Sequence, residues 1–384
     1  MKSRIYLDYN ATAPLAPEVR AAMEPWLEPV PTNPGAVHQF GQAARAAVEG
    51  ARAEVAAFCG GGEVIFTSGG TEADNLAITS QLGWPPSGHI VVSAIEHPAI
   101  LEPAAAHAAM GVEVTAVRVD AEGRVEPSAV AAAITAETRL VSVMAANTET
   151  GTLQPVAEVA LLAAERGVPV HTDAVQAAAW LDLEAHVGGA QFLSLSGHKI
   201  GGPPGIGALV VRQPATIQPG LHGGGQQLGR RPGTEPTFLQ VGLAAACRRV
   251  ATQRVDQAHR VAALTDDFLG RVLAATDARV TVPSAPRLPN TIHICFANCP
   301  ADLLVARADL DGLAISAGSA CASGVAHGSY VLAALDVPPE VRDGAVRVSL
   351  GYDTTASEIE RAAALLASAV AAVRGALGHE AAAV

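Results

Sequence analysis

The chain has 384 residues, of which 49% are hydrophobic and 16% are charged. This balance supplies enough apolar side chains for a large core and excludes a disordered chain. Lys and Arg number 25 against 37 Asp and Glu, so the formal net charge is −12. An acidic balance argues against direct nucleic-acid binding or an anionic-membrane role, because both need basic surfaces. Chains of this length usually divide, so we expect one large domain and a smaller one.

The N-terminus reaches Asp8 without an apolar segment, so it does not form a signal peptide. The most apolar late stretch, residues 362–373, is shorter than the roughly 20 residues that a membrane span needs. It predicts one buried face of a C-terminal helix. The five cysteines are odd in number and scattered, which does not suggest a disulfide framework. These features predict a cytoplasmic protein without a membrane anchor.

Short β-branched runs alternate with helical stretches along the first part of the chain. Helices rich in Ala, Glu and Arg are predicted over residues 42–58, 127–134 and 156–166. Strands are predicted over residues 63–67, 89–93, 112–117, 138–144, 168–172, 192–195 and 206–211. Strands of about five residues that alternate with helices of about 10–15 indicate βαβ units around a mostly parallel sheet.

After Pro236 the pattern changes. One long helix is expected over residues 237–275, followed by strands within 288–296 and 346–350 and a helix over 300–310. We therefore predict an α/β chain whose large domain, residues 14–255, holds a mostly parallel seven-stranded sheet flanked by helices. Residues 1–13 and 256–376 would form a smaller α+β domain, and residues 377–384 a tail.

Polar side chains gather directly after the predicted strands, where parallel sheets bind ligands. Lys199 follows the strand over 192–195 in the segment Ser194-Leu-Ser-Gly-His-Lys199. An isolated lysine at such a turn is usually a surface residue. The alternative is a Schiff-base lysine, whose amine becomes nucleophilic when partial desolvation lowers its pKa. The neighbouring motifs decide between these two interpretations.

Two motifs favour the Schiff-base lysine. Asp173 follows a strand, and an acidic group in that place suits the ring nitrogen of pyridoxal phosphate. In Thr67-Ser-Gly-Gly-Thr-Glu-Ala-Asp74 a strand runs through a glycine turn into a helix, and the start of such a helix favours a phosphate group. Each motif alone would be an ordinary turn or cap. Neither a P-loop nor a dinucleotide-binding glycine motif is present.

A phosphate cradle, a ring-nitrogen partner and a lysine thus occur in this order, each after a strand. In this arrangement the sequence resembles the cysteine desulfurases, fold type I pyridoxal-phosphate enzymes of the class V aminotransferase family with an aspartate-aminotransferase-like architecture. The resemblance runs from residue 6 to about residue 351. Its main segments are Tyr6-Leu-Asp-Tyr-Asn-Ala-Thr-Ala-Pro14, Thr67-Ser-Gly-Gly-Thr-Glu72, Asn147-Thr-Glu-Thr-Gly151, His171-Thr-Asp-Ala-Val-Gln176, Ser196-Gly-His-Lys199 and Ala317-Gly-Ser-Ala-Cys321.

The resemblance implies a cofactor, pyridoxal 5′-phosphate, and a role for each matching residue. Lys199 would hold the cofactor as a Schiff base and later move the Cα proton of the substrate. His97 would stack on the cofactor ring, and Asp173 would pair with the ring nitrogen. Gln176 and Asn147 would contact the ring oxygen or the substrate.

The resemblance also assigns the phosphate group. Gly70, Thr71, Ser196 and His198 would hold it within one chain. Thr234 would reach the phosphate of a neighbouring subunit, which implies a homodimer with shared sites. Gly70 departs from the family pattern, because alanine is usual at that position.

Two further residues would act on the substrate. Arg347 would bind its carboxylate through a bidentate fork, a geometry for which Arg is suited. Cys321 lies in a run of small residues, and its thiolate would attack the substrate sulfur, so the site should lower its pKa from about 8.5. The other four cysteines are predicted to be buried in the core. No metal site is predicted, apart from a transient iron–sulfur contact at Cys321.

The implied enzyme converts L-cysteine to L-alanine and leaves a persulfide on Cys321. The persulfide sulfur would pass to an acceptor protein, either an iron–sulfur scaffold or a tRNA-thiolation protein. Two alternatives stay open: a selenocysteine lyase or another class V enzyme, and a catalytically silent sulfur-handling protein. Replacement of Cys321 by Ser should leave the cofactor bound but stop sulfur transfer.

Overall fold

The computed structural model describes residues 4–28, 33–212, 215, 217–318 and 329–378. Its larger sheet has seven strands. The strand order is β2-β8-β7-β6-β5-β3-β4. Only β8 runs antiparallel to its neighbours in this sheet. The strands are β2 (Glu63–Thr67), β3 (His89–Ser93), β4 (Glu113–Val117), β5 (Thr138–Ser142), β6 (Val170–Asp173), β7 (Phe192–Ser196) and β8 (Gly207–Val211). The predicted α/β class and all seven predicted strands are confirmed.

Helices cover both faces of this sheet, because successive side chains of a strand point to opposite sides. In β3, Val91 joins the apolar cluster that contains Val55 and Val159 of two helices, whereas Ile90 and Val92 join a second cluster. Apolar residues on both faces explain why the strands are near-continuous apolar runs. The helices are α1 (Pro17–Met23), α2 (Gln39–Phe58), α3 (Gly70–Leu82), α4 (Pro98–Ala108), α5 (Pro127–Ala133), α6 (Val156–Ala164) and α7 (Leu183–His186).

A smaller antiparallel sheet has β10 (Thr291–Cys295) between β9 (Arg279–Val280) and β12 (Ala345–Ser349). The N-terminal strand β1 (Ile5–Tyr6) pairs in parallel with β11 (Leu313–Ala314), and Asp8 forms a parallel bridge with Ser349. The N-terminal segment therefore lies beside the late strands. The accompanying helices are α9 (Ala301–Leu310), α10 (Tyr330–Ala334), α11 (Pro339–Arg342) and α12 (Ala356–Ala376).

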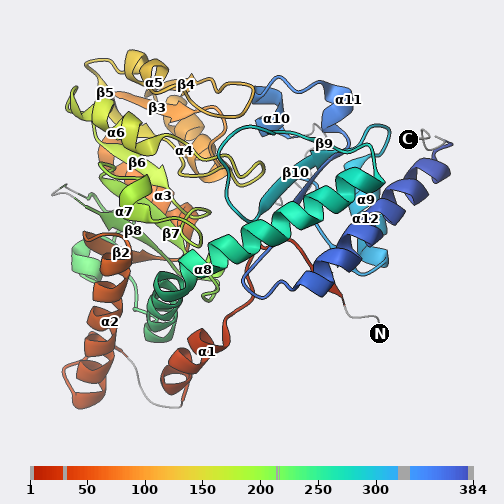
Figure 1. Ribbon diagram of the computed structural model, residues 1–384. Coiled ribbons are helices and arrows are strands. Elements are labelled where there is room, and N and C mark those ends of the chain that lie inside the picture. Colours follow the sequence, from red (N-terminus) through yellow and green to blue (C-terminus); the bar gives the residue numbers. More distant parts are fainter. Residues whose placement is uncertain (1–3, 29–32, 213–214, 216, 319–328, 379–384) are drawn as a thin grey trace.

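The helix α8 (Thr237–Ala275) connects the two sheets and matches the predicted range. Its 39 residues run from the layer around the large sheet to the small one (Figure 1), where α8 lies beside α12. One apolar cluster contains both Val141 of β5 and Val348 of β12, so the core is continuous between the two parts. The predicted boundary at residue 255 falls within α8, and the division into domains stays a prediction.

In the described part of the chain, no helix has the length and apolar character that crossing a membrane requires. The apolar stretch predicted near the C-terminus belongs to α12, whose buried residues include Leu366, Val370 and Val373. This helix starts with a capping box formed by Thr355 and Glu358. The prediction of one buried helix face is confirmed.

Candidate active site

A cavity of about 200 Å³ lies at the carboxyl ends of β6 and β7, against the start of α3 and the N-terminal segment. Nine residues predicted from the sequence line it: Gly70, Thr71, His97, Asp173, Gln176, Ser196, His198, Lys199 and Arg347. The remaining lining residues were not predicted: Asn10, Ala11, Asp74, Met144, Ala146, Thr148 and Val175. The cavity thus brings most of the predicted site together.

The start of α3 supplies donors for an anion. Gly70 is the first residue of this helix, and the first N–H groups of a helix lack partners within it and carry its positive dipole end. A Cβ atom on Gly70 would lie 2.8 Å from Cγ2 of Val175, and one on Gly207 would lie 2.5 Å from the carbonyl carbon of Gly69. Glycine at these two positions lets the helix start approach β8 and the turn after β6.

Asp173 ends β6 at the inner wall of the cavity and is buried. Its Oδ1 accepts a hydrogen bond from the Val175 N–H at 2.9 Å. Burial, and then the nearby Asp74, raises the pKa of Asp173 to about 6, while His97 lowers it. The carboxyl group is therefore mostly ionised at neutral pH and can act as a negative partner inside the cavity.

A buried group of polar side chains supports Asp173 from behind. The His171 ring nitrogens contact Ser142 Oγ and Ser194 Oγ, each at 2.9 Å, and Nε2 lies 3.4 Å from Asp74 Oδ1. Burial raises the pKa of Asp74 to about 7 and lowers the pKa of His171 to about 4. The imidazole is therefore neutral, so the Asp74–His171 contact is not an ion pair.

His97 is held by the helix that follows it. It is the N-cap residue of α4, and its Nδ1 accepts a hydrogen bond from the Ala99 N–H at 3.1 Å. Burial lowers the pKa of His97, and Lys199 lowers it further, although Asp173 opposes this. The imidazole is neutral, and its bond to the start of α4 fixes its orientation. It therefore offers a flat surface on which a ring can stack.

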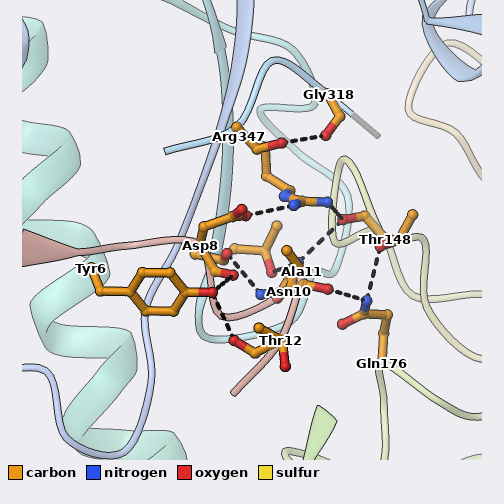
Figure 2. A network of polar contacts seen from close by, with 12 residues as sticks. Tyr6, Asp8, Asn10, Ala11, Thr12, Thr148, Gln176, Gly318 and Arg347 are labelled. Atoms are coloured by element: carbon orange, nitrogen blue, oxygen red, sulfur yellow. Dashed lines mark hydrogen bonds and ion pairs between the residues drawn. The ribbon is translucent and has the colours of Figure 1, made fainter. Parts of the chain in front are cut away.

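Lys199 ends the 3₁₀ turn η2 (Gly197–Lys199), directly after β7. Its Nζ donates to the main-chain oxygen of Ala11 at 3.0 Å and to that of Asn10. Gln176 Nε2 donates to the same Asn10 oxygen at 3.0 Å and to Thr148 Oγ1 at 2.9 Å. Figure 2 shows how the N-terminal segment meets Gln176 and Thr148. The carbonyl of Asn10 therefore fixes two side chains of the cavity.

Asn10 joins the N-terminal segment to the small sheet and to the loop that follows β5. It is buried, and its Nδ2 donates to the Thr148 oxygen at 3.2 Å and to Thr291 Oγ1 at 2.9 Å. Its Oδ1 accepts from Asn290 Nδ2 at 3.0 Å, and its N–H donates to Ser349 Oγ at 2.9 Å. These bonds place the first residues of the chain in the wall of the cavity.

Arg347 lies in the middle of β12 and is 1% exposed. Its Nη2 pairs with Asp8 Oδ1 at 2.6 Å, and its Nη1 donates to the Thr148 oxygen at 3.1 Å (Figure 2). Its Nε is buried and has no hydrogen-bond partner among the described residues. His293 faces it across the β10–β12 pair, and burial followed by the Arg347 charge lowers the pKa of His293 to about 3. Arg347 is therefore a buried cation on the cavity wall.

Three predicted residues are not on the cavity wall. The Asn147 amide is buried and bonds to the Ile95 oxygen and to the N–H groups of Glu149 and Thr150. Thr234 is exposed in the segment that precedes α8. Cys321 lies outside the described residues. The roles of these three residues stay predictions.

His198, a predicted phosphate ligand, lies at the cavity next to Lys199. Its Nδ1 contacts Thr12 Oγ1 at 3.1 Å. Burial, and then the Lys199 charge, lowers the pKa of His198 to about 4. A neutral imidazole at this place can donate or accept a hydrogen bond without adding charge.

The four cysteines predicted to be core residues are buried, which confirms that prediction. Burial raises the pKa of the Cys59 thiol to about 12 and also raises the pKa of Cys247, Cys295 and Cys299. Their thiols therefore stay protonated and unreactive at neutral pH.

Residues 5–362 match the family model of the class-V aminotransferases. A cysteine desulfurase of Cereibacter sphaeroides is 41% identical over 93% of this chain and 93% of its own length. The cysteine desulfurase IscS of Dictyoglomus turgidum is 38% identical over 94% of this chain and 92% of its own length. A solved structure described as a NifS-like protein superposes with a TM-score of 0.88 at 30% identity, covering 95% of this chain and 98% of that one. The chain therefore belongs to the class-V aminotransferase family and, within it, to the cysteine desulfurases.

Members of this family are pyridoxal-phosphate enzymes, which confirms the cofactor expected from the sequence. The cavity fits this group by the chemistry of its donors. The start of α3 with Ser196 and His198 suits the phosphate, and the buried Asp173 carboxylate suits the ring nitrogen. The Lys199 amine suits the aldehyde carbon. The imidazole of His97, which caps α4, suits the face of the cofactor ring.

Proposed function

We propose that this protein is a pyridoxal-phosphate-dependent cysteine desulfurase that converts L-cysteine to L-alanine and forms a persulfide on Cys321. The observation that carries the proposal is a single cavity that unites Lys199, Asp173 and His97 with the buried guanidinium of Arg347. The first three residues suit the cofactor, and the fourth suits the carboxylate of an amino acid. The relatives that are named cysteine desulfurases support the choice of substrate.

The cofactor, when bound, supplies an electron sink for the carbon skeleton of the amino acid. Arg347 binds and orients the substrate carboxylate, because its Nε is buried without a partner in the described chain. Lys199 carries the amine that takes and returns the Cα proton. Asp173, mostly ionised at neutral pH, would stabilise positive charge at the ring nitrogen of the bound cofactor.

The sulfur step belongs to Cys321. Its thiolate attacks the substrate sulfur, a sulfur–sulfur bond forms, and the carbon–sulfur bond of the substrate breaks. The electron pair of the broken bond stays with the carbon skeleton, which takes up a proton and leaves as alanine. The transferred sulfur is oxidised and the carbon reduced, so no further reductant is needed in this half of the cycle.

Further parts of the proposal concern the assembly. Thr234 is exposed before α8, as a residue that reaches the phosphate of a second subunit would be, so we propose a homodimer. The Cys321 persulfide passes its sulfur to an acceptor protein of iron–sulfur assembly or tRNA thiolation. The acidic balance and the unreactive core cysteines are in keeping with a cytoplasmic location.

The test is a paired assay of alanine and sulfide released from L-cysteine with a thiol reductant present. Wild type should give equal amounts of both products, and Cys321→Ala should give neither while its cofactor spectrum is unchanged. Cys299→Ala is the matched control, because it removes a buried thiol and should keep turnover. Products unaffected by Cys321→Ala would indicate a lyase-like route. A cofactor-loaded wild type without products would indicate a silent protein.

A further inference from the structure

The guanidinium of Arg347 already holds a carboxylate that the chain itself supplies. Asp8 Oδ1 lies 2.6 Å from Arg347 Nη2, and the parallel bridge between Asp8 and Ser349 fixes the Asp8 backbone beside β12. The two partners are 339 residues apart in sequence. Figure 2 shows the contact between the two side chains, and of the two only Arg347 lines the cavity.

The two partners differ in exposure. The Arg347 side chain is 1% exposed and is held on a second side by the Thr148 oxygen, whereas the Asp8 side chain is 18% exposed. Asp8 is therefore the partner that can move without leaving its own charge in an apolar environment. The Arg347 side chain is almost fully buried, so its charge needs an anion beside it.

A second carboxyl group near Arg347 is less suited to that role. Glu149 is buried and accepts a hydrogen bond from Ser329 Oγ at 2.5 Å. Burial raises the pKa of Glu149, although the Arg347 charge lowers it. Asp8 is thus the carboxylate in direct contact with the guanidinium, and His293 opposite is neutral.

We propose that Asp8 is the resident counter-ion of Arg347, and that the carboxylate of the incoming amino acid must displace it. This inference rests on the proposed function, in which Arg347 is the carboxylate site. Asp8 is then a positioning residue that stabilises the free enzyme and weakens amino-acid binding. Binding exchanges the Asp8 carboxylate for that of the amino acid. The free energy gained at Arg347 is therefore only the difference between the two contacts.

Asp8→Asn tests this inference, because Asn has the same shape and can still accept the Nη2 hydrogen bond without a negative charge. The measurement is a titration of the cofactor-loaded protein with L-alanine, followed by the absorption of the bound cofactor. L-alanine should bind about tenfold tighter to Asp8→Asn than to wild type, the change that removal of a close competing charge brings. Ethylamine, which has no carboxylate, should bind equally to both.

Stability provides a second readout. Asp8→Asn should lower the melting temperature without ligand, because it removes an ion pair from a buried cation. A merely structural role would lower stability and weaken binding together, whereas the counter-ion role moves them in opposite directions. If Asp8→Asn does not fold, Asp8→Gln is compared with Asp8→Glu, because these two side chains have equal length and differ only in charge. L-alanine should then bind more tightly to Asp8→Gln than to Asp8→Glu.

Asp182→Asn is the matched control. It removes the charge of another Asp–Arg pair, 2.9 Å from Arg254 Nη2 and 57% exposed, and Asn remains a good N-cap for α7. It should leave L-alanine binding unchanged. Unchanged or weaker L-alanine binding in Asp8→Asn, or equal gains for ethylamine, would overturn the counter-ion role. If Arg347→Gln binds L-alanine as tightly as wild type, the carboxylate site of the proposed function fails instead.

Discussion

Replacement of Asn10 by Ala tests whether the N-terminal segment builds the cavity. Asn10 is 2% exposed, and its side chain makes three hydrogen bonds: two from Nδ2, to the Thr148 oxygen and Thr291 Oγ1, and one accepted from Asn290 Nδ2. The Ala variant loses all three and leaves a small cavity at the junction of the two sheets. We expect it to lose both stability and cofactor.

The size of the loss follows from the partners. Each hydrogen bond contributes about 1 kcal/mol net, and a buried group left without a partner costs about 1–3 kcal/mol. All three partners keep another bond: Asn290 Nδ2 also donates to the Leu350 oxygen, the Thr148 oxygen also accepts from Arg347, and Thr291 Oγ1 also donates to Asn290 Oδ1. The unfolding free energy should therefore fall by about 2–4 kcal/mol, including the space left by the missing amide.

The assay is urea unfolding of the cofactor-free protein, combined with cofactor retention after dialysis, read by absorption. Retention should fall, because the lost side-chain bonds hold in place the main-chain oxygen that accepts from both Lys199 and Gln176. Gln42→Ala serves as control, since it removes an exposed amide with one backbone bond. A loss under about 0.5 kcal/mol, the range of ordinary surface substitutions, with normal retention would refute the reasoning.

Three further predictions concern the cavity and its surroundings. Lys199→Arg should abolish covalent attachment of the cofactor, so that borohydride reduction and peptide mass analysis find the adduct only in wild type. The raised pKa values of Asp74 and Glu96, about 7 and about 8, mean that the folded state holds these protons more tightly than the unfolded chain. The contribution of these groups to stability should therefore be greatest below about pH 4 and fall as the pH rises from there to about 8. Glu96→Gln should flatten this slope, measured as the urea midpoint at each pH. Gly70→Ala should reduce stability by about 1 kcal/mol through its contact with Val175, and the added change Val175→Ala should restore it.

The sequence allowed prediction of elements whose apolar pattern is long. The buried runs of the large sheet and the periodic stretch over α8 carried enough residues to define their type and range. The strands β1, β9 and β11 have two residues each, which is too short for any period. Their pairing depends on segments far apart in sequence, so they were found only in the structure.

The candidate site divides in the same way. Side chains in recognisable motifs, such as Lys199 and Asp173, were predictable. Asn10 and Ala11 contact Lys199 through main-chain oxygens, which any residue has, so their types gave no signal for that contact. Asp74 looked like an ordinary acid near a helix start, and its burial follows from the packing of α3 against the sheet.

The pairing of the N-terminal segment with β12 also affects how the protein is made. Asp8 and Asn10 leave the ribosome 339 residues before their respective partners Arg347 and Ser349. The seven-stranded sheet can form earlier, since its last strand ends at residue 211. The complete cavity can then form only after β12 has been synthesised. A prematurely terminated chain that lacks β12 would have a lysine but no complete cavity around it.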